Sequence, residues 1–341
     1  MRIINQLKGK IRKLIYNKYY YWYIVRKNRE KKTLHMLADI YSQKKDTTSD
    51  CPICVVNIYE GDIKSGGLAD RLRGIVSTYS VCKELGIRYK LFFSDPFPLS
   101  DYLVPAKYDW SICREYLSFD SNCENCVVLD TTQESDYQKS KQEAFLKKRL
   151  KEIAFQTHVY TNAGFSYDKD FYHLYNELFK PSLRLQNAID LMLTRLGTRY
   201  VSVSCRFLNL LGDFNEPCGY KTSLSKNEID VLISKIEKVI EEIHEKWVGF
   251  TVLLNSDSRL FLDRLSVYEY IEINDGNITH IDNEKSDYSY ETYEKTFLDL
   301  YGIANASHIY LIKDSRMFKS GFPYMASKIG NVKFEIIEIE D

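Results

Sequence analysis

The sequence has no uninterrupted apolar run of about 18 residues, the length that a helix needs to cross a lipid bilayer, so we expect no transmembrane helix. A secretory signal is not expected either, because the apolar stretch after Tyr19 is short, rich in tyrosine and without a small-residue cleavage site. Net charge is also absent, since 47 Lys and Arg balance 47 Asp and Glu. This balance argues against nucleic-acid binding by the protein as a whole.

The eight cysteines do not favour a disulfide framework or a zinc site. Two Cys-x-x-Cys pairs, Cys51 with Cys54 and Cys123 with Cys126, stand about seventy residues apart, whereas zinc ribbons typically have roughly 15 to 20 residues between pairs. Each pair opens an apolar run typical of a strand, where a thiol packs as a small hydrophobic group. The other cysteines are single, which indicates unpaired thiols in a reducing cytoplasm.

Charge is distributed unevenly along the chain. Residues 1–45 contain 13 Lys or Arg against two acidic residues, Glu30 and Asp39, a formal +11 that leaves −11 on the rest. Apolar residues recur there at helical spacing from Ile4 to Ile15, so we expect a basic, amphipathic helical arm over residues 1–50. Two interpretations stay open: the arm binds an anionic membrane surface, or it packs on the body of the protein.

At 341 residues the chain exceeds the size of one hydrophobic core, so two domains or one large α/β body are expected. From residue 51 onward, apolar runs alternate with helical periods, the pattern of a parallel sheet with crossover helices. The predicted strands of a first half are 54–59, 89–93, 126–130 and 158–161, and its predicted helices are 68–85 and 140–155. Helices at 168–179 and 183–196, separated at Pro181, are expected to bridge to a second half.

The second half repeats the pattern. Its predicted strands are 199–207, 249–255, 268–273, 308–312 and 332–337. A helix after the first of them has a capping-box signature, Ser225 with Glu228, and a single apolar stripe that ends at Trp247. We therefore expect a domain over residues 51–197 and a second over residues 198–341. In such sheets ligands bind beyond the carboxyl ends of the strands, so polar motifs there are the candidates for a site.

The first candidate motif joins a strand to a helix between Asn57 and Ile75. Gly66 and Gly67 let the backbone approach a ligand, and Asp70, Arg71 and Arg73 follow at the start of the helix. Guanidinium groups can fork onto phosphate or carboxylate oxygens. The motif predicts an anion site, although an ordinary strand-to-helix loop has the same glycines.

Three further motifs follow strands of the second half. Arg206 ends a strand, ahead of a loop that holds Asp213. The alternatives to a role in ligand binding are a surface arginine or an ion pair with Asp213. Ser256 and Asp257 end the next strand, where Asp257 can also be read as a helix cap.

The last motif lies near the end of the chain. Ser320 and Gly321 follow a strand and precede a helix that begins near Phe322, where a hydroxyl and exposed N–H groups would bind phosphate. The alternative is that Ser320 is an N-cap residue.

Together, in this order, these segments resemble the GDP-fucose-dependent fucosyltransferase superfamily, which contains protein O-fucosyltransferases and α1,6- and α1,2-type enzymes. The resemblance covers roughly residues 53–337, although only about forty positions carry it. The segments GGLADRLRGI, VSVSCRFLNLLGDF, LLNSDSRLFLDRL and KSGFPYMASKIG look like the family's successive motifs. Two departures stand out: Ser204 replaces a histidine that many members have, and Asp213 lies farther from Arg206 than usual.

The resemblance implies an α/β, GT-B-like architecture of two facing Rossmann-like domains, with the nucleotide held mainly by the second. It implies that Arg206 contacts the diphosphate and that Ser320, Gly321 and Phe322 cradle it from the other side. By resemblance Asp257 would hold the guanine or ribose end of the nucleotide. Arg71 and Arg73 would face the cleft from the first domain.

The expected function is transfer of fucose from GDP-fucose to a glycan acceptor, inverting and without a metal or other cofactor, in surface-polysaccharide or glycoconjugate synthesis. Arg206 is the candidate catalytic residue, because a fixed guanidinium would stabilise the charge on the departing β-phosphate. The sequence singles out no general base, and Asp70 is an acceptor-side or loop-shaping candidate. The alternatives are a GT-B transferase for another nucleotide sugar and a non-catalytic nucleotide- or sugar-binding module. We expect a cytoplasmic protein, with attachment to the inner face of the membrane left open.

Overall fold

The structure is a computed structural model of the chain. It describes residue 37 and residues 51–60, 66–119, 126–129, 136–151, 153–165, 170–214, 223–279, 281 and 289–340. The predicted basic arm therefore lies outside the described residues, except for Leu37. None of the described helices combines the length and the apolar character that crossing a bilayer requires.

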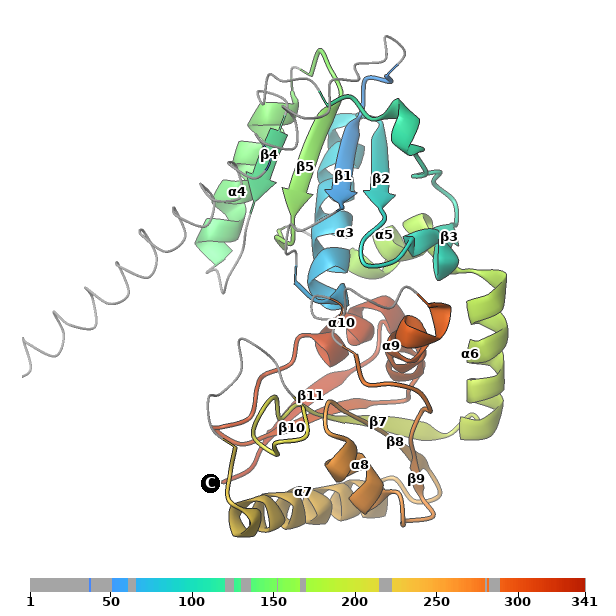
Figure 1. Ribbon diagram of the computed structural model, residues 1–341, viewed down its shortest axis with the longest axis vertical. Coiled ribbons are helices and arrows are strands. Elements are labelled where there is room, and N and C mark those ends of the chain that lie inside the picture. Colours follow the sequence, from blue (N-terminus) through green and yellow to red (C-terminus); the bar gives the residue numbers. More distant parts are fainter. Residues whose placement is uncertain are drawn as a thin grey trace, which may run out of the picture.

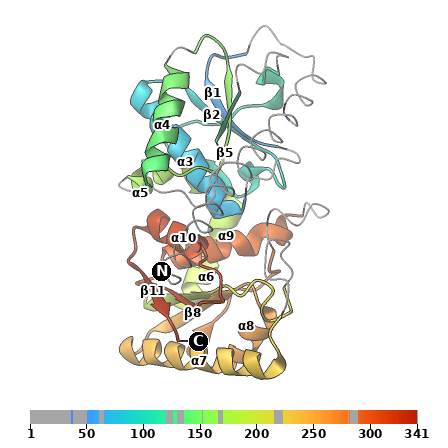
Figure 2. The same ribbon diagram turned by 90° about the vertical axis from the view of Figure 1, so that its left-hand side faces the viewer.

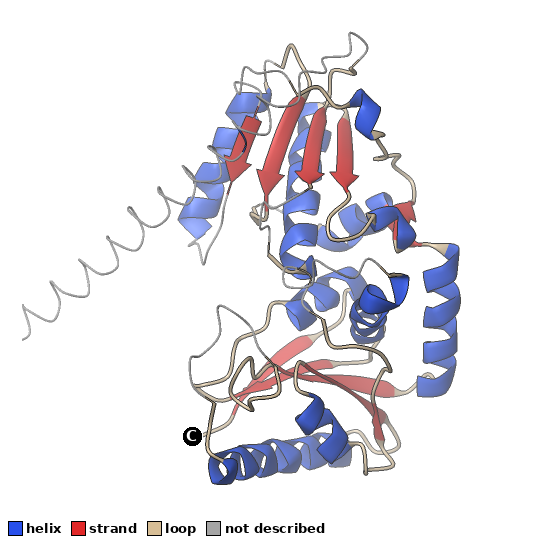
Figure 3. Cartoon of the chain, in the orientation of Figure 1, coloured by secondary structure: helices blue, strands red, loops and turns tan. Residues whose placement is uncertain are grey.

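The N-terminal half contains a parallel sheet (Figures 1 and 3). Its described strands are β1 (Val55–Tyr59), β2 (Tyr89–Phe93), β4 (Cys126–Leu129) and β5 (Thr157–Thr161), in the spatial order β2-β1-β5-β4. The helix α3 (Leu68–Leu85) follows β1, and α4 (Asp136–Leu150) leads into β5. The predicted strands are confirmed, because buried parallel strands read as continuous apolar runs. The helix α3 also has the predicted bounds.

The C-terminal half contains a second parallel sheet with helices on both faces. Its described strands are β7 (Tyr200–Cys205), β8 (Thr251–Ser256), β9 (Ile271–Glu272), β10 (Ile309–Lys313) and β11 (Phe334–Glu338), in the order β11-β10-β7-β8-β9. Its helices are α7 (Lys226–Lys246), α8 (Arg259–Leu265), α9 (Tyr290–Ala304) and α10 (Phe322–Gly330). The predicted strands are confirmed here too, and the capping box of Ser225 and Glu228 is present at the start of α7.

A small bridge connects the halves. It consists of the 3-10 helix η2 (Leu99–Asp101), the antiparallel strands β3 (Leu103–Pro105) and β6 (Phe179–Pro181), and the helices α5 (Phe171–Leu178) and α6 (Leu183–Leu196). The 3-10 helix η3 (Arg114–Tyr116) belongs to the N-terminal half, where the Tyr116 carbonyl oxygen accepts a hydrogen bond from the Gln156 side chain. The predicted break at Pro181 is confirmed, because the chain forms β6 there and α6 starts after the N-cap Ser182. The side chain of Ser182 accepts a hydrogen bond from the Leu185 N–H.

The order of the C-terminal sheet reverses beside β7. From β7 the chain moves through α7 to β8 and through α8 to β9, whereas from β10 it moves through α10 to β11 on the other side. Figures 1 and 2 show α7 and α8 below this sheet and α9 and α10 above it, toward the N-terminal half. The loops that leave β7 and β10 therefore diverge, and such a divergence is where open α/β sheets bind ligands.

One continuous hydrophobic core joins the two halves. It includes Val55 and Leu72 of the N-terminal half together with Leu253 and Ile329 of the C-terminal half. Its central part is aromatic: Tyr102 stacks on Phe297 with ring centroids 4.3 Å apart. The Tyr102 hydroxyl also donates a hydrogen bond to the Tyr290 carbonyl oxygen at 2.6 Å, which adds a polar contact to this packing. Aromatic pairs of this kind stabilise beyond their buried area.

Leu37 shows how one residue of the N-terminal segment is placed. Its side chain is buried in a separate cluster with Val56, Ile58 and Tyr160 of the N-terminal sheet. This residue therefore packs on the body of the protein, while the other residues predicted for the arm lie outside the described part.

Replacement of Phe297 by alanine tests the shared core. The side chain is fully buried, so Phe297→Ala should lower the free energy of unfolding by about 3–5 kcal/mol through lost contacts and a residual cavity. Urea denaturation should show a single transition, displaced as a whole. The control Leu183→Ala alters an 80% exposed side chain and should stay within about 0.5 kcal/mol of wild type. Two separate transitions, of which only one moves, would contradict a core common to both halves.

Candidate functional site

Charged residues directly follow the strands at the centre of the C-terminal sheet. Arg206 comes after β7, Asp257 after β8 and Asp314 after β10. Because these strands are parallel neighbours, their carboxyl ends meet at one edge, and the structure brings the predicted Arg206 and Asp257 together there.

Asp257 fixes the loop that begins with Arg206. Its two carboxylate oxygens accept hydrogen bonds from the N–H groups of Phe207 and Leu208, each at 2.8 Å. Leu208 has a φ of 53°, a left-handed conformation that costs a non-glycine residue about 1–3 kcal/mol, and these bonds hold it. Burial raises the pKa of Asp257 above its ordinary value near 3.8, although the backbone donors and the Arg206 guanidinium act in the opposite direction.

Arg206 lies between a carboxylate and an aromatic ring. Its Nε is 3.9 Å from Oδ2 of Asp257, and its guanidinium carbon is 5.4 Å from the centre of the Phe318 ring. The Phe318 N–H donates a hydrogen bond to the Arg206 carbonyl oxygen at 3.1 Å, which ties the loop after β10 to the end of β7. The alternative ion pair with Asp213 is not formed in the structure. The arginine side chain is 21% exposed, so it remains accessible to a ligand.

Asp213 has a different role from Asp257. One oxygen, Oδ2, accepts hydrogen bonds from the Ser258 hydroxyl at 2.9 Å and from the Leu260 N–H at 2.8 Å. The Ser258 hydroxyl in turn accepts from the Phe261 N–H, so Ser258 is the N-cap of α8. Asp257 is therefore not the cap of this helix.

The motif after β10 lies beside Arg206 in the same edge. Ser320 is buried, and its hydroxyl accepts a hydrogen bond from the Phe322 N–H at 3.3 Å. Gly321 precedes α10, and the space where a Cβ would stand is open to at least 4 Å. The N-terminus of α10 thus has room for a ligand.

Sequence reasoning missed the buried acid of this loop. Asp314 accepts hydrogen bonds from the N–H groups of Arg316 and Met317, and its Oδ2 lies 2.7 Å from Nε of Arg316. The sequence signal that could have revealed Asp314 is its position directly after a strand, like that of Asp257. Asp314 shapes the loop that carries Phe318 and Ser320.

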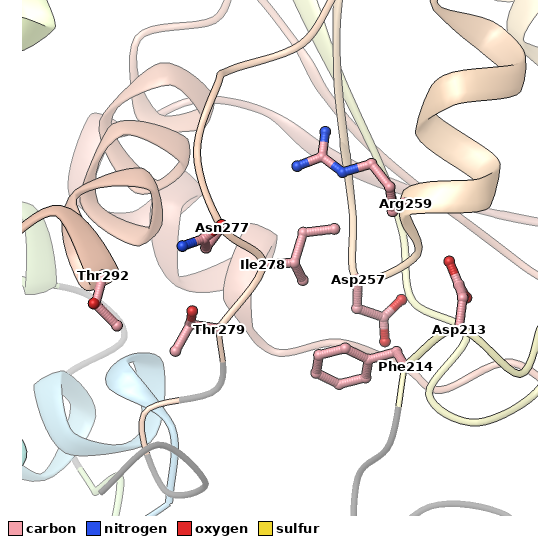
Figure 4. A pocket seen from close by; sticks show the side chains of 8 residues that line it. All are labelled: Asp213, Phe214, Asp257, Arg259, Asn277, Ile278, Thr279 and Thr292. Carbon is pink, nitrogen blue, oxygen red and sulfur yellow. The ribbon is translucent and has the colours of Figure 1, made fainter. Parts of the chain in front are cut away.

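A pocket of about 340 Å³ adjoins this edge (Figure 4). Its lining residues are Asp213, Phe214, Asp257, Arg259, Asn277, Ile278, Thr279 and Thr292. Sequence reasoning found the acidic side of the pocket and missed the opposite wall, which comes from the segment before α9. The Arg259 guanidinium donates a hydrogen bond to the Gly276 carbonyl oxygen at 2.8 Å and so holds that wall in place.

Two further residues singled out in the sequence, Ser256 and Ser204, lie in neighbouring strands of the C-terminal sheet. Ser256 is the last residue of β8, and its hydroxyl accepts a hydrogen bond from the Ser258 N–H at 3.2 Å. Ser204, where the family resemblance leads one to expect histidine, is buried in β7 and pairs in register with Asn255.

The first motif lies at the carboxyl edge of the other sheet. Arg71 is buried, and its guanidinium donates hydrogen bonds to the carbonyl oxygens of Gly66 and Asp95. Arg73 donates to the Asn162 carbonyl oxygen at 2.9 Å and forms an ion pair with Asp70 at 2.8 Å.

These bonds hold Gly66 and the start of α3 on the sheet. Gly66 has a φ of 78°, which favours glycine, and Gly67 is the N-cap of α3. Gly74 lets α3 approach β5, since a Cβ there would lie 2.4 Å from the Thr161 carbonyl oxygen. The anion-binding role of this motif stays a prediction.

Among the described residues, no group of three or more His, Cys, Asp or Glu side chains is placed to hold a metal ion. Cys123 of the second Cys-x-x-Cys pair lies outside the described residues.

No protein-family model matches the sequence, and no curated protein matches it. Solved structures do resemble the fold. An Arabidopsis thaliana FUT1 mutant in complex with GDP aligns with a TM-score of 0.50 at 13% identity, over 89% of this chain and 74% of that one. A Bradyrhizobium fucosyltransferase, NodZ, aligns at 0.49 and 13% identity, over 84% and 95% of the two chains. POFUT1 in complex with GDP aligns at 0.40 and 13%, over 86% and 100%.

The similarity to FUT1 shows the fold. Together with the two parallel sheets, it fits a GT-B-like α/β architecture, as the sequence predicted.

Removal of the Asp257 carboxylate tests its hold on the Arg206 loop. Asp257→Ala leaves two backbone donors without their acceptor, so the free energy of unfolding in urea should fall by about 1–3 kcal/mol. Because burial raises its pKa, folded Asp257 holds a proton more tightly than the unfolded chain does. The difference between wild type and variant should therefore widen as the pH falls from 7 toward 4. The exposed Asp263→Ala is the matched control; a constant difference across that pH range would contradict the raised pKa.

Proposed function

We propose that the protein is a glycosyltransferase that transfers fucose from GDP-fucose to a glycan acceptor. One observation carries this proposal. The strand order of the C-terminal sheet reverses between β7 and β10, and Arg206 lies at the end of one of these strands while the Phe318–Phe322 loop follows the other. The solved structure that carries the comparison, an Arabidopsis thaliana FUT1 mutant, is in complex with GDP. The proposed domains are residues 51–197 and 198–341, two facing Rossmann-like units.

The diphosphate would bind at the divergence of the two loops. Arg206 offers a guanidinium there, and the start of α10 at Gly321 and Phe322 offers backbone N–H groups and the positive end of a helix dipole. Ser320 adds a hydroxyl beside them. These groups lie on two loops that are hydrogen-bonded to each other, so the site needs little reorganisation when charge develops.

The guanine base would occupy the pocket next to this edge. Its Watson–Crick edge presents two donors, the N1–H and the N2 amino group, and a carboxylate accepts both. Asp213 and Asp257 line the pocket, and Asn277 and Thr279 stand on the opposite wall (Figure 4). Ser256 lies one residue before Asp257 and would shape the ribose end.

The reaction separates charge between the sugar and the nucleotide. As the bond to fucose breaks, negative charge grows on the β-phosphate, and the fixed Arg206 guanidinium stabilises this state more than the ground state. The acceptor hydroxyl would attack from the opposite face, with inversion and without a metal. The acceptor would approach from the N-terminal half, where Gly66, Gly67, Asp70, Arg71 and Arg73 shape the first loop.

We place this activity in surface-polysaccharide or glycoconjugate synthesis in the cytoplasm, with residues 1–45 near an anionic membrane surface. One observation favours a second candidate, a non-catalytic nucleotide- or sugar-binding module: Ser204 stands where many members of the resembled family have histidine. A transferase for another nucleotide sugar would use the same phosphate chemistry. Nucleotide binding without hydrolysis or transfer of the donor would favour the module.

Loss of the Arg206 guanidinium tests the diphosphate site. GDP should raise the melting temperature of wild type more than UDP or CMP does, and Arg206→Ala should abolish the shift, because a ligand stabilises the state that it binds. Transfer or donor hydrolysis should fall by about 10²–10³-fold in the variant. Arg199→Ala, at the opposite end of β7, is the control and should behave as wild type. An unchanged GDP shift in Arg206→Ala would refute the assignment.

A nucleotide that lacks the N2 amino group tests the base pocket. Inosine diphosphate keeps the diphosphate and N1–H of GDP but loses one donor to the carboxylate. Hydrogen bonds to charged groups contribute about 1.5–3 kcal/mol, so calorimetry should show binding weakened by about 10- to 100-fold. Equal affinities for the two nucleotides would place the base outside an acidic pocket.

A further inference from the structure

The far wall of the pocket is a loop that other elements must hold in place. We call residues 273–279, between β9 and α9, the far wall; all of them are described, and none belongs to a helix or strand. The last three line the pocket opposite Asp213 and Asp257 (Figure 4). Since no strand ladder sets the path of these residues, side chains from neighbouring elements must set it.

Asn274 is the buried residue of the far wall, with 1% of its surface exposed. Its amide nitrogen donates a hydrogen bond to Oδ1 of Asp299 on α9, and its amide oxygen accepts one from Nη2 of Arg195 on α6, each at 3.0 Å. A guanidinium only donates and a carboxylate only accepts, so the two partners fix which way the amide points. Asn274 thus ties the far wall to two helices in a defined orientation.

Lys295, on the same helix as Asp299, secures the acceptor of this bond. Its side chain is 3% exposed, and its Nζ donates to both carboxylate oxygens of Asp299, at 2.9 and 2.8 Å. The far wall also packs on Lys295 directly: Gly276 has a φ of 113°, and a Cβ there would lie 3.0 Å from the lysine Cβ. Asp299 is therefore neutralised and oriented within the protein itself, and the lysine stem lies against the far wall.

Two arginines hold the far wall on either side of Asn274. Arg195 of α6 also donates to the Ile273 carbonyl oxygen at 3.4 Å, and Arg259 of α8 donates to the Gly276 carbonyl oxygen at 2.8 Å. The helices α6, α8 and α9 therefore all direct hydrogen bonds to one short loop. A buried ion pair contributes little net stability compared with apolar packing, but its directed bonds fix a geometry, so this arrangement suits a positioning role.

We propose that Asn274, Lys295 and Asp299 position the far wall, and that the wall so placed gives the protein its preference for a guanine base. The inference rests on the function proposed above. One edge of guanine presents the acceptors O6 and N7, and the side chains of Asn277 and Thr279 have the donors that such acceptors need. The three positioning residues do not themselves line the pocket, so they act through the far wall.

Calorimetry with GDP and UDP on the full chain tests this assignment. Wild type should prefer GDP. Asn274→Leu keeps a side chain of similar size but forms neither hydrogen bond, so it should weaken GDP binding by about tenfold. UDP binding should stay nearly unchanged, since a pyrimidine lacks the N7 edge that the far wall would meet. In donor hydrolysis or transfer, KM for GDP-fucose should rise while kcat stays near wild type, because the lost contacts bind ground state and transition state alike.

A second pair of variants separates position from stability. Lys295→Met leaves the Asp299 carboxylate without its cation and should also lower the preference for GDP. Adding Asp299→Asn removes that charge and keeps an amide oxygen that accepts from Asn274, so the double variant should recover most of the preference. The matched control is Asn187→Leu, at an exposed position of α6, which should bind both nucleotides like wild type. Thermal melting should show that every variant is folded.

The outcomes separate this inference from the proposed function. Retention of the wild-type preference for GDP in Asn274→Leu would overturn the inference and leave the proposed function standing. An equal loss of GDP and UDP binding would also overturn it, because it would show a general loosening of the site. Failure of the double variant to recover would remove Lys295 and Asp299 from the assignment. A wild type that binds neither nucleotide, or binds both equally, would contradict the proposed base pocket and this inference with it.

Discussion

The continuous core between the two sheets determines the geometry of everything else in this protein. The helices α9 and α10 cover one face of the C-terminal sheet and at the same time pack into the core of the N-terminal half, through rings such as Tyr102 against Phe297. The same helices begin at the carboxyl edge of their sheet, so the packing that joins the halves also sets where the N-terminus of α10 points. Fold stability and site geometry therefore depend on shared side chains.

At that edge, charges are used in two ways. Asp257, Asp213 and Asp314 accept backbone hydrogen bonds and fix the loops, whereas Arg206 is held by a carboxylate and a phenylalanine ring and keeps part of its surface open. The acids thus supply preorganisation, and the arginine supplies the charge that a diphosphate would meet. In the N-terminal half, by contrast, the Arg71 guanidinium is buried and donates hydrogen bonds to the carbonyl oxygens of Gly66 and Asp95.

Much of the fold could be read from the sequence, because buried parallel strands appear as apolar runs and the helices between them show capping and periodicity. Arg206, Asp257 and Ser320 could be placed at one edge because strand ends meet there in a parallel sheet. The far wall of the pocket could not, since Asn277 and Thr279 reach it through a loop whose path depends on tertiary contacts such as that of Arg259 with Gly276. The burial of Arg71 was equally invisible, because a guanidinium that binds carbonyl oxygens has the same sequence signature as one that binds phosphate.

A crystal structure with GDP-fucose or GDP bound is the most direct test of the central claim, that the C-terminal sheet edge between β7 and β10 is the nucleotide site. The diphosphate should lie within hydrogen-bond distance of the Arg206 guanidinium and the first N–H groups of α10, with the base between Asp257 and Asn277. A nucleotide bound instead at the first loop, beside Arg73 and Asp70, would contradict the claim.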